Sequence, residues 1–212
     1  MKIRLFIMVL LLGTTFVFGA IPKNAATALK DLQRRYKSIK TFRCEFNEQF
    51  QWQFTGELVT SNGTIVSDVG DRFRMETPEQ VVVCDGTSLY RYNSLKNQVM
   101  IEPVKDAANL LPKRLLLDLG SEFEAEAITP ISVVGQEGFR LDLKPLKSDE
   151  SLMSGAVIWV TALDLIVRKM QMDDLNGNRT TYILLQIEID KPVDLHETTF
   201  EIPEGAELFD LR

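Results

Sequence analysis

Hydrophobic and polar residues alternate along residues 42–54, which read FRCEFNEQFQWQF. Every second position from Phe42 carries Phe, Cys or Trp except Glu48, and the positions between them are all polar. Alternate side chains of a β-strand point to opposite faces, so this period predicts a strand with five aromatic residues on one face. Burying them would contribute at most on the order of 20 kcal/mol. Such a face fits either a sheet core or the wall of an apolar binding site.

A helical period precedes this strand, and strand patterns follow it. Apolar residues recur at steps of four and three from Ala25 to Ile39, which predicts a helix over residues 24–40 with Asn24 as its N-cap. Period-two patterns and turn residues predict strands at residues 42–50, 56–67, 72–77, 81–93 with a turn at Asp85-Gly86, 99–104, 139–143, 156–161, 166–173 and 180–190.

Two details of these strands carry expectations of their own. Asn62-Gly63 is typical of either a turn or a bulge. Period two within residues 180–190 places one set of apolar residues on a single face: Ile183, Leu185, Ile187 and Ile189.

One leucine-rich segment interrupts the strands. Residues 106–120 end in Gly120, a helix stop signal, and Pro112 splits them into two short helices. The fold class is therefore α+β and mainly antiparallel β. We find no linker or repeat and expect a single domain over residues 20–212, whose large sheet curls on itself or keeps a concave interior.

The first residues have the pattern of a secretory signal peptide. Lys2 and Arg4 precede an apolar run and then small residues, which predicts cleavage after Gly19 and export across the inner membrane. The alternative is an uncleaved membrane anchor. Export would permit a disulfide between Cys44 and Cys84, but both lie in apolar strand patterns, where buried free thiols are an equal alternative.

Composition and motifs argue against several function classes. The formal net charge of −6 does not favour nucleic acid as a partner. His196 is the only histidine, which suits a surface or capping role, and no Gly-x-Ser-x-Gly or His-Glu-x-x-His motif accompanies it. We therefore predict no enzymatic activity, no metal and no cofactor, with a lipid-modifying hydrolase that uses His196 as the remaining enzymatic alternative.

Several segments in order resemble a known family. They are TFRCEFNEQF (41–50), GDRFRMETPE (70–79), VVVCDGTSLYRYN (81–93), and NGNRTTYILLQIEID (176–190) followed by FEIPEGAEL (200–208). Their order and spacing over residues 25–208 are similar to those of the LolA family, the periplasmic carriers of outer-membrane lipoproteins.

The resemblance implies an unclosed β-barrel with a hydrophobic cavity covered by lid helices. It also implies a monomer that takes acylated lipoproteins from an inner-membrane ABC-type release complex to an outer-membrane acceptor. With the apolar pattern, it assigns a lipid-binding wall to Phe42, Phe46, Phe50, Trp52, Phe54, Phe73, Met75, Met100, Trp159, Met170 and Met172. It assigns the lid to Leu110, Leu111, Leu115, Leu116 and Leu119.

The chain departs from the family pattern in two places. Family members carry an arginine where this chain has Val69, so the latch that the arginine provides for the lid is in question. That departure keeps open a second reading, a carrier or sensor of another lipid or glycolipid. Phe50, Trp52 and Phe54 extend the aromatic track beyond the family's first strand, and we expect them at the rim of the cavity.

Overall fold

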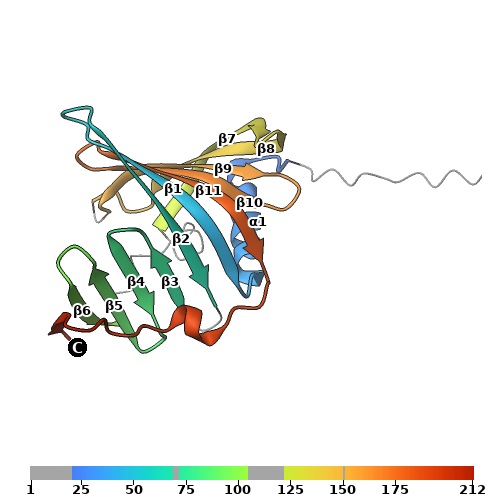
Figure 1. Cartoon of the computed structure of the whole chain (residues 1–212). Coiled ribbons are helices and arrows are strands. Elements are labelled where there is room, and N and C mark those ends of the chain that lie inside the picture. Colours follow the sequence, from blue (N-terminus) through green and yellow to red (C-terminus); the bar gives the residue numbers. More distant parts are fainter. Residues whose placement is uncertain (1–20, 69–71, 105–121, 150) are drawn as a thin grey trace, which may run out of the picture.

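A computed structural model describes residues 21–68, 72–104, 122–149 and 151–212. Within these residues, twelve strands form one sheet in the order β12-β6-β5-β4-β3-β2-β1-β11-β10-β9-β8-β7 (Figure 1). The strands are β1 (Phe42–Gln51), β2 (Leu58–Ser67), β3 (Phe73–Glu76), β4 (Gln80–Cys84), β5 (Ser88–Asn93), β6 (Gln98–Pro103), β7 (Phe123–Val133), β8 (Gln136–Pro145), β9 (Met153–Thr161), β10 (Ile166–Asp174), β11 (Arg179–Ile189) and β12 (Glu207–Asp210).

The sheet curls but does not close, because its two end strands, β7 and β12, do not pair with each other (Figure 1). All neighbouring strands are antiparallel except β12, which runs parallel to β6. The prediction of a mainly antiparallel, unclosed sheet is confirmed. The described residues also contain one α-helix, α1 (Ala25–Ser38), and a short 3-10 helix, η2 (Leu195–Thr198).

Helix α1 forms as its sequence pattern predicts. The Asn24 side chain accepts a hydrogen bond from the backbone N–H of Thr27 at 2.8 Å and so caps the helix. The apolar stripe of α1 packs on β7 and β8. We call the face of the sheet that α1 covers the inner face, and the opposite one the outer face.

One buried hydrogen bond fixes α1 to a bulge in β10. The pairing of β10 with β9 is irregular between Val167 and Lys169, and the N–H of Val167 donates to the Tyr36 hydroxyl at 3.0 Å. Burial raises the pKa of Tyr36, so the phenol stays neutral. The hydroxyl of Tyr36 on the helix therefore accepts a hydrogen bond from the buried N–H of Val167, at the point where the bulge interrupts the strand pairing.

The inner face carries two hydrophobic clusters. The larger joins α1 to β1, β2 and β7–β11, and includes Phe46, Phe139 and Met170. The smaller contains Phe73, Val82, Cys84 and Leu89 on β3–β5. Half-buried Met75 contacts both clusters.

Asn62-Gly63 marks neither a turn nor a bulge, because both residues lie inside β2 in regular register with β1. Gly63 lies opposite Phe46, and a Cβ on Gly63 would come within 2.4 Å of the Phe46 ring. The glycine is needed for space rather than for a turn, since the aromatic ring lies across the neighbouring backbone.

Strand β11 corrects the predicted apolar face. A bulge shifts its register with β1 between Arg43 and Glu45, and Gln186 takes a positive φ of 47°. The shift places Leu184 in the core and leaves Leu185 exposed. The expectation that residues 183, 185, 187 and 189 share one face is therefore wrong.

Strands β7 and β12 form the two edges of the sheet. The predicted elements omit β7, whose FEAEAITPISV sequence contains two Glu, two Ala and a Pro, residue types that are depleted in strands. After β11 the chain crosses the sheet through η2 and reaches its far edge as β12 (Figure 1).

Three predictions lie outside the described residues: the signal peptide at residues 1–19, the position of Val69, and the lid leucines 110, 111, 115, 116 and 119. Among the helices that the structure describes, none has the length and apolar character needed to cross a membrane.

Candidate functional site

The predicted wall begins on the inner face of β1. Phe42 and Phe46 are buried in the larger cluster. Phe50 is half-buried, and its ring meets the Trp52 ring edge-on with centroids 4.9 Å apart. Alternation along β1 therefore brings an almost continuous aromatic track from the core to the end of the strand, with Glu48 as its one polar member.

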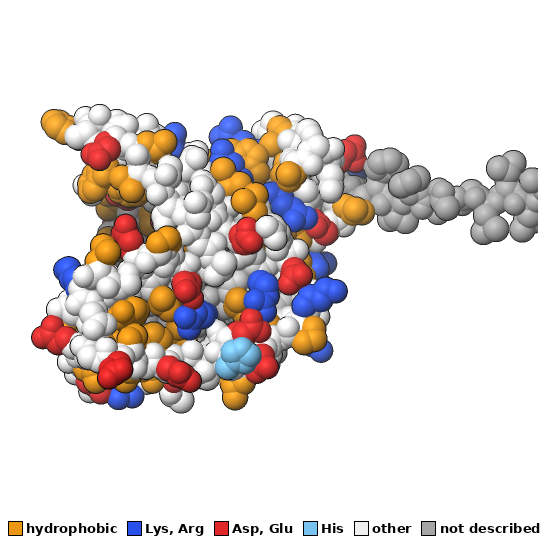
Figure 2. Space-filling view, viewed as in Figure 1, with side chains coloured by type: hydrophobic (Ala, Val, Ile, Leu, Met, Phe, Trp, Pro, Cys, Tyr) orange, Lys and Arg blue, Asp and Glu red, His pale blue; other side chains and the backbone are white. Residues whose placement is uncertain are grey.

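The turn between β1 and β2 exposes the last part of this track. Trp52 is 46% exposed and Phe54 fully exposed, and Leu58 and Val59 on the other arm are also exposed. The space-filling view shows hydrophobic side chains on this projecting hairpin, at the upper left, above a recess that separates it from β4–β6 (Figure 2). The tip is an apolar surface in contact with solvent.

The hairpin tip is held in place by the neighbouring turn. The N–H of Gln53 donates to the Asn178 side chain at 3.1 Å, in the turn between β10 and β11. Within the hairpin, the N–H of Trp52 donates to the carbonyl of Glu57 at 2.9 Å. Because these bonds already fix the turn, less conformational entropy is lost when a ligand or partner contacts its aromatic residues.

Five other predicted wall residues divide between core and surface. Phe73 is buried in the smaller cluster, and Met170 and Met172 are buried in the larger one. Met75 lies half-buried between the clusters, and Met100 is 38% exposed on β6. Strand register places all five on the inner face.

Trp159 is separated from the other predicted wall residues. It alternates with the buried Ile158 and Val160 on β9, so its ring lies on the outer face. There the Lys169 ammonium stands 4.4 Å from the ring centroid, a cation–π contact. We leave Trp159 out of the proposed wall for this reason.

Both cysteines are buried free thiols, so the disulfide alternative is not realised. Cys44 lies on β1 and Cys84 on β4, with β2 and β3 between them. Burial raises the pKa of the Cys44 thiol to about 12, which keeps it protonated and unreactive.

Sequence analysis did not find the polar pair in this wall. The Tyr182 hydroxyl on β11 donates to Oε1 of Glu48 at 2.8 Å. Burial, and then the Glu48 carboxylate, raise the pKa of Tyr182. In the sequence Glu48 only interrupts the aromatic period, and its partner lies 134 residues away, so no local pattern announces the pair.

A cavity of about 590 Å³ lies on the outer face, beneath the segment that follows β11. Its walls come from the outer sides of β1–β5 and from the C-terminal segment: Arg43, Thr64, Val66, Arg74, Val81, Tyr92, His196, Glu197, Thr199, Phe200, Glu201 and Pro203. Its size suits a small ligand, but both of its arginines, Arg43 and Arg74, are already ion-paired with glutamates. Arg74 pairs with Glu76 at 2.8 Å.

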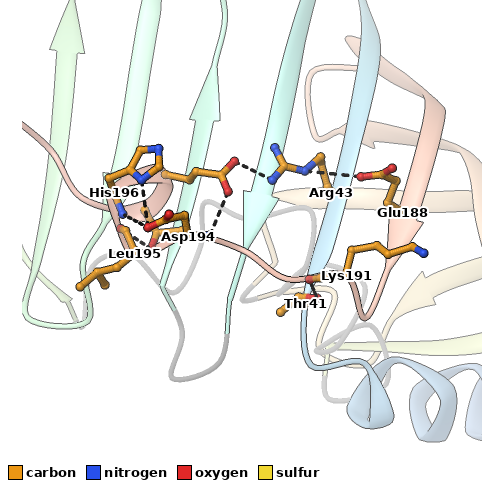
Figure 3. Close-up of polar contacts among 9 residues, drawn as sticks. Thr41, Arg43, Glu188, Lys191, Asp194, Leu195 and His196 are labelled. Carbon is orange, nitrogen blue, oxygen red and sulfur yellow. Dashed lines mark hydrogen bonds and ion pairs between the residues drawn. The ribbon is translucent and has the colours of Figure 1, made fainter.

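Arg43 joins this cavity to the C-terminal segment (Figure 3). Its Nη2 lies 2.5 Å from Oε2 of Glu197, and its Nε lies 3.6 Å from Glu188. Glu197 and Asp194 also form a capping box at η2. The backbone N–H of Asp194, and then Arg43, lower the pKa of Glu197.

His196 does not form a catalytic constellation with the described residues. Its ring is mostly exposed, and Nδ1 lies 2.9 Å from Oδ1 of Asp194 (Figure 3). This contact lowers the pKa of Asp194. Among the described residues, no three His, Cys, Asp or Glu side chains are grouped so that they could hold a metal ion.

Comparison with known proteins identifies the family. The family model for the outer membrane lipoprotein carrier protein LolA matches residues 37–202, which span the sheet from β1 to the end of η2. The chain belongs to the LolA family. The match includes the aromatic strand β1 and most of the inner face.

Individual relatives of the LolA family agree with this assignment. An outer-membrane lipoprotein carrier protein from Chromohalobacter salexigens is 26% identical over 208 residues, covering 97% of each chain. One from Alkalilimnicola ehrlichii is 27% identical over 215 residues, covering 99% of this chain and 97% of its own. The crystal structure of an uncharacterized conserved protein from Thermus thermophilus shares the fold, with a TM-score of 0.57 at 10% identity, over 87% of this chain and 98% of that one.

Proposed function

We propose that this protein is a periplasmic carrier that binds the acyl chains of lipoproteins released from the inner membrane and delivers them to the outer membrane. The observation that carries the proposal is the LolA family match over residues 37–202. Relatives named outer-membrane lipoprotein carrier proteins also match this chain along nearly their whole length. LolA is a family of carriers and not of enzymes.

The geometry of the inner face supports this role. An open sheet leaves one apolar face available to a ligand, and the aromatic track of β1 leads from that face to an exposed hairpin. Each methylene sheltered from water contributes about 0.8 kcal/mol, so several acyl chains would need a large apolar surface. The proposed binding wall comprises Phe42, Phe46, Phe50, Trp52, Phe54, Phe73, Met75, Met100, Met170 and Met172, and the proposed lid comprises Leu110, Leu111, Leu115, Leu116 and Leu119.

Release of such a ligand needs an acceptor in which the acyl chains are at least as stable. The flexible thioether side chains of Met75 and Met100 suit a wall that adapts to different chains, because they repack at little cost. We propose an inner-membrane ABC-type complex as the donor and an outer-membrane protein as the acceptor. The carrier would act as a monomer in the periplasm after cleavage of its signal peptide.

Inner-membrane vesicles loaded with labelled lipoprotein and the release complex test this proposal. Addition of the purified protein and ATP should move lipoprotein into the soluble fraction, in a complex with the carrier. Vesicles that retain all their lipoprotein under these conditions, while an established LolA protein releases it, would refute the proposal.

A second candidate is a carrier or sensor of another lipid or glycolipid. It is favoured by Val69, which stands where the LolA family has an arginine. Mass spectrometry of the ligand that purifies with the protein separates the two candidates, because this one predicts a free lipid and no acylated peptide.

A further inference from the structure

Glu48 is a carboxylate in the middle of the aromatic track of β1. Its side chain shares the inner face with Phe46 and Phe50, and it lies opposite Tyr182 on β11. The Tyr182 hydroxyl, at 2.8 Å, is its one hydrogen-bond partner among the described residues. Within the same residues, no Lys, Arg or His forms an ion pair with it.

Other partly buried glutamates have a basic partner. Glu102 lies 2.5 Å from Arg91, and Glu197 lies 2.5 Å from Arg43. A half-buried charge without a counter-ion costs stability, and an apolar residue would fit a plain sheet core better at this position. Packing alone therefore does not account for a glutamate at this position.

The surroundings of Glu48 leave part of the carboxylate available. An ionised carboxylate has about four lone-pair positions, and the phenol occupies one. The Tyr182 ring is held by an edge contact with Phe46, with centroids 5.8 Å apart, so the hydroxyl orients the carboxylate from a fixed position. The remaining positions can accept further N–H or O–H donors from a ligand.

The place of Glu48 along the strand suggests which part of a ligand it meets. It lies between the buried Phe46 and the half-buried Phe50, roughly 13 Å along the strand from Trp52 at about 3.3 Å per residue. A ligand whose acyl chains lie against the apolar residues of the inner face, and whose polar end leaves that face beside Glu48, would place its acyl-to-polar junction at this carboxylate. In an acylated polypeptide that junction contains amide N–H groups.

We propose that Glu48, positioned by Tyr182, recognises an amide N–H beside the acyl chains of a lipidated polypeptide and disfavours lipids with an anionic group at that place. The inference rests on the proposed carrier function and deepens it. A carboxylate only accepts hydrogen bonds and repels a phosphodiester or a fatty-acid carboxylate. Selection of acylated polypeptide over the bulk phospholipid of the membrane would follow from one residue.

Two synthetic lipopeptides with an uncharged peptide tail test the proposal. Both carry an S-diacylglyceryl group and a third acyl chain on the first residue, which is cysteine with an N-acyl amide in one and its 2-hydroxy analogue, with oxygen in place of the α-nitrogen and an O-acyl ester, in the other. The wild-type protein should bind the amide at least tenfold more tightly, since a hydrogen bond to a charged group contributes about 1.5–3 kcal/mol. Glu48→Leu should bind both with the affinity that wild type has for the ester.

Two further variants guard against a purely structural effect. Glu48→Gln keeps the shape of the side chain and should lose most of the preference. Glu45→Leu is the matched control, because Glu45 lies on the same strand, is exposed, and faces the other side of the sheet. It should keep the full preference.

The outcomes separate this inference from the proposed function. Wild-type protein that binds both lipopeptides equally, or Glu48→Leu that keeps the preference, overturns the role of Glu48 and leaves the carrier function standing. Binding of neither lipopeptide overturns the carrier function itself. If Glu48→Leu weakens phosphatidylethanolamine binding but not lipopeptide binding, the recognised donor is a headgroup ammonium, and the amide proposal is wrong.

Discussion

At the scale of single residues, the contact between Gly63 and Phe46 shows how a small side chain makes room for the aromatic wall. The Phe46 ring occupies the space in which any larger residue at position 63 would place its Cβ. A wall built from large side chains on adjacent strands needs such a gap, because interiors are already packed to the density of organic crystals.

Gly63→Ala should therefore destabilise the protein strongly. The new methyl group would meet the Phe46 ring at 2.4 Å and the carbonyl oxygen of Glu76 at 2.3 Å, and the backbone contact cannot be relieved by a rotamer change. We expect a loss of about 3 kcal/mol in the free energy of unfolding, measured with urea. Gly155→Ala is the control, since its nearest atom lies at 3.4 Å, and it should change stability by less than about 1 kcal/mol. Equal effects of the two substitutions would contradict this packing.

The exposed aromatic residues of the hairpin should matter for ligand transfer and not for stability. Phe54 lies wholly in water and Trp52 is about half exposed, so the free energy of unfolding should change by less than about 0.5 kcal/mol for Phe54→Ala and by no more than about 1 kcal/mol for Trp52→Ala. In the double variant, lipopeptide binding or its rate of transfer between carrier and acceptor vesicles should fall severalfold. Leu163→Ala is the matched control, because Leu163 is exposed in the turn between β9 and β10, at the end of β10 that lies away from the hairpin. Intact ligand content and transfer in the double variant would mean that the hairpin is not a rim of the site.

At the scale of elements, the sequence predicted correctly those helices and turns that are stabilised by residues close together in the chain. The helix α1 and its Asn24 cap, and the Asp85-Gly86 hairpin between β4 and β5, depend on residues within a few positions of each other. Their outcome agrees with the pattern because no tertiary contact opposes it.

Elements that depend on distant partners were not predictable in the same way. The bulge at Gln186 exists in the pairing of β11 with β1, which joins residues about 140 positions apart, and it reverses which leucine is buried. Strand β7 is stabilised by β8 and α1 rather than by β propensity. The site was predictable as an aromatic face, but not the outer position of Trp159 or the pair of Glu48 with Tyr182.

The ion pair between Glu197 of the C-terminal segment and Arg43 of β1 should contribute less to stability as the pH falls. The pKa of Glu197 is lowered in the folded protein, so its stabilising contribution is present above the ordinary glutamate pKa of about 4.3 and is lost as the pH falls through the lower folded value. Glu197→Gln should cost about 1 kcal/mol at pH 7, because Arg43 is partly exposed and solvent screens the pair.

Urea unfolding at pH 7 and below about pH 4 measures this contribution, and the difference between wild type and Glu197→Gln should shrink in acid. Glu188→Gln is the matched control, since Glu188 faces the same arginine at 3.6 Å with greater exposure, and should have the smaller effect. A Glu197→Gln effect that stays constant with pH would show that the charge of Glu197 does not hold the segment.

At the scale of the whole molecule, an open sheet with a partly covered apolar face combines shelter and release. The helix α1 fills one part of the inner face, and the aromatic track of β1 leads away from it to the exposed hairpin. A fully closed core would have no room for acyl chains, whereas a fully open apolar face would aggregate. The family match and this architecture together support a carrier that binds its ligand reversibly.

Native mass spectrometry of the protein purified from the cell envelope of its own organism tests the central claim most directly. The account predicts a carrier that holds one acylated polypeptide, whose mass and fragments identify acyl chains on an N-terminal cysteine. Protein that carries only a free lipid, or that carries no ligand even after purification from lipoprotein-rich envelopes, would contradict it.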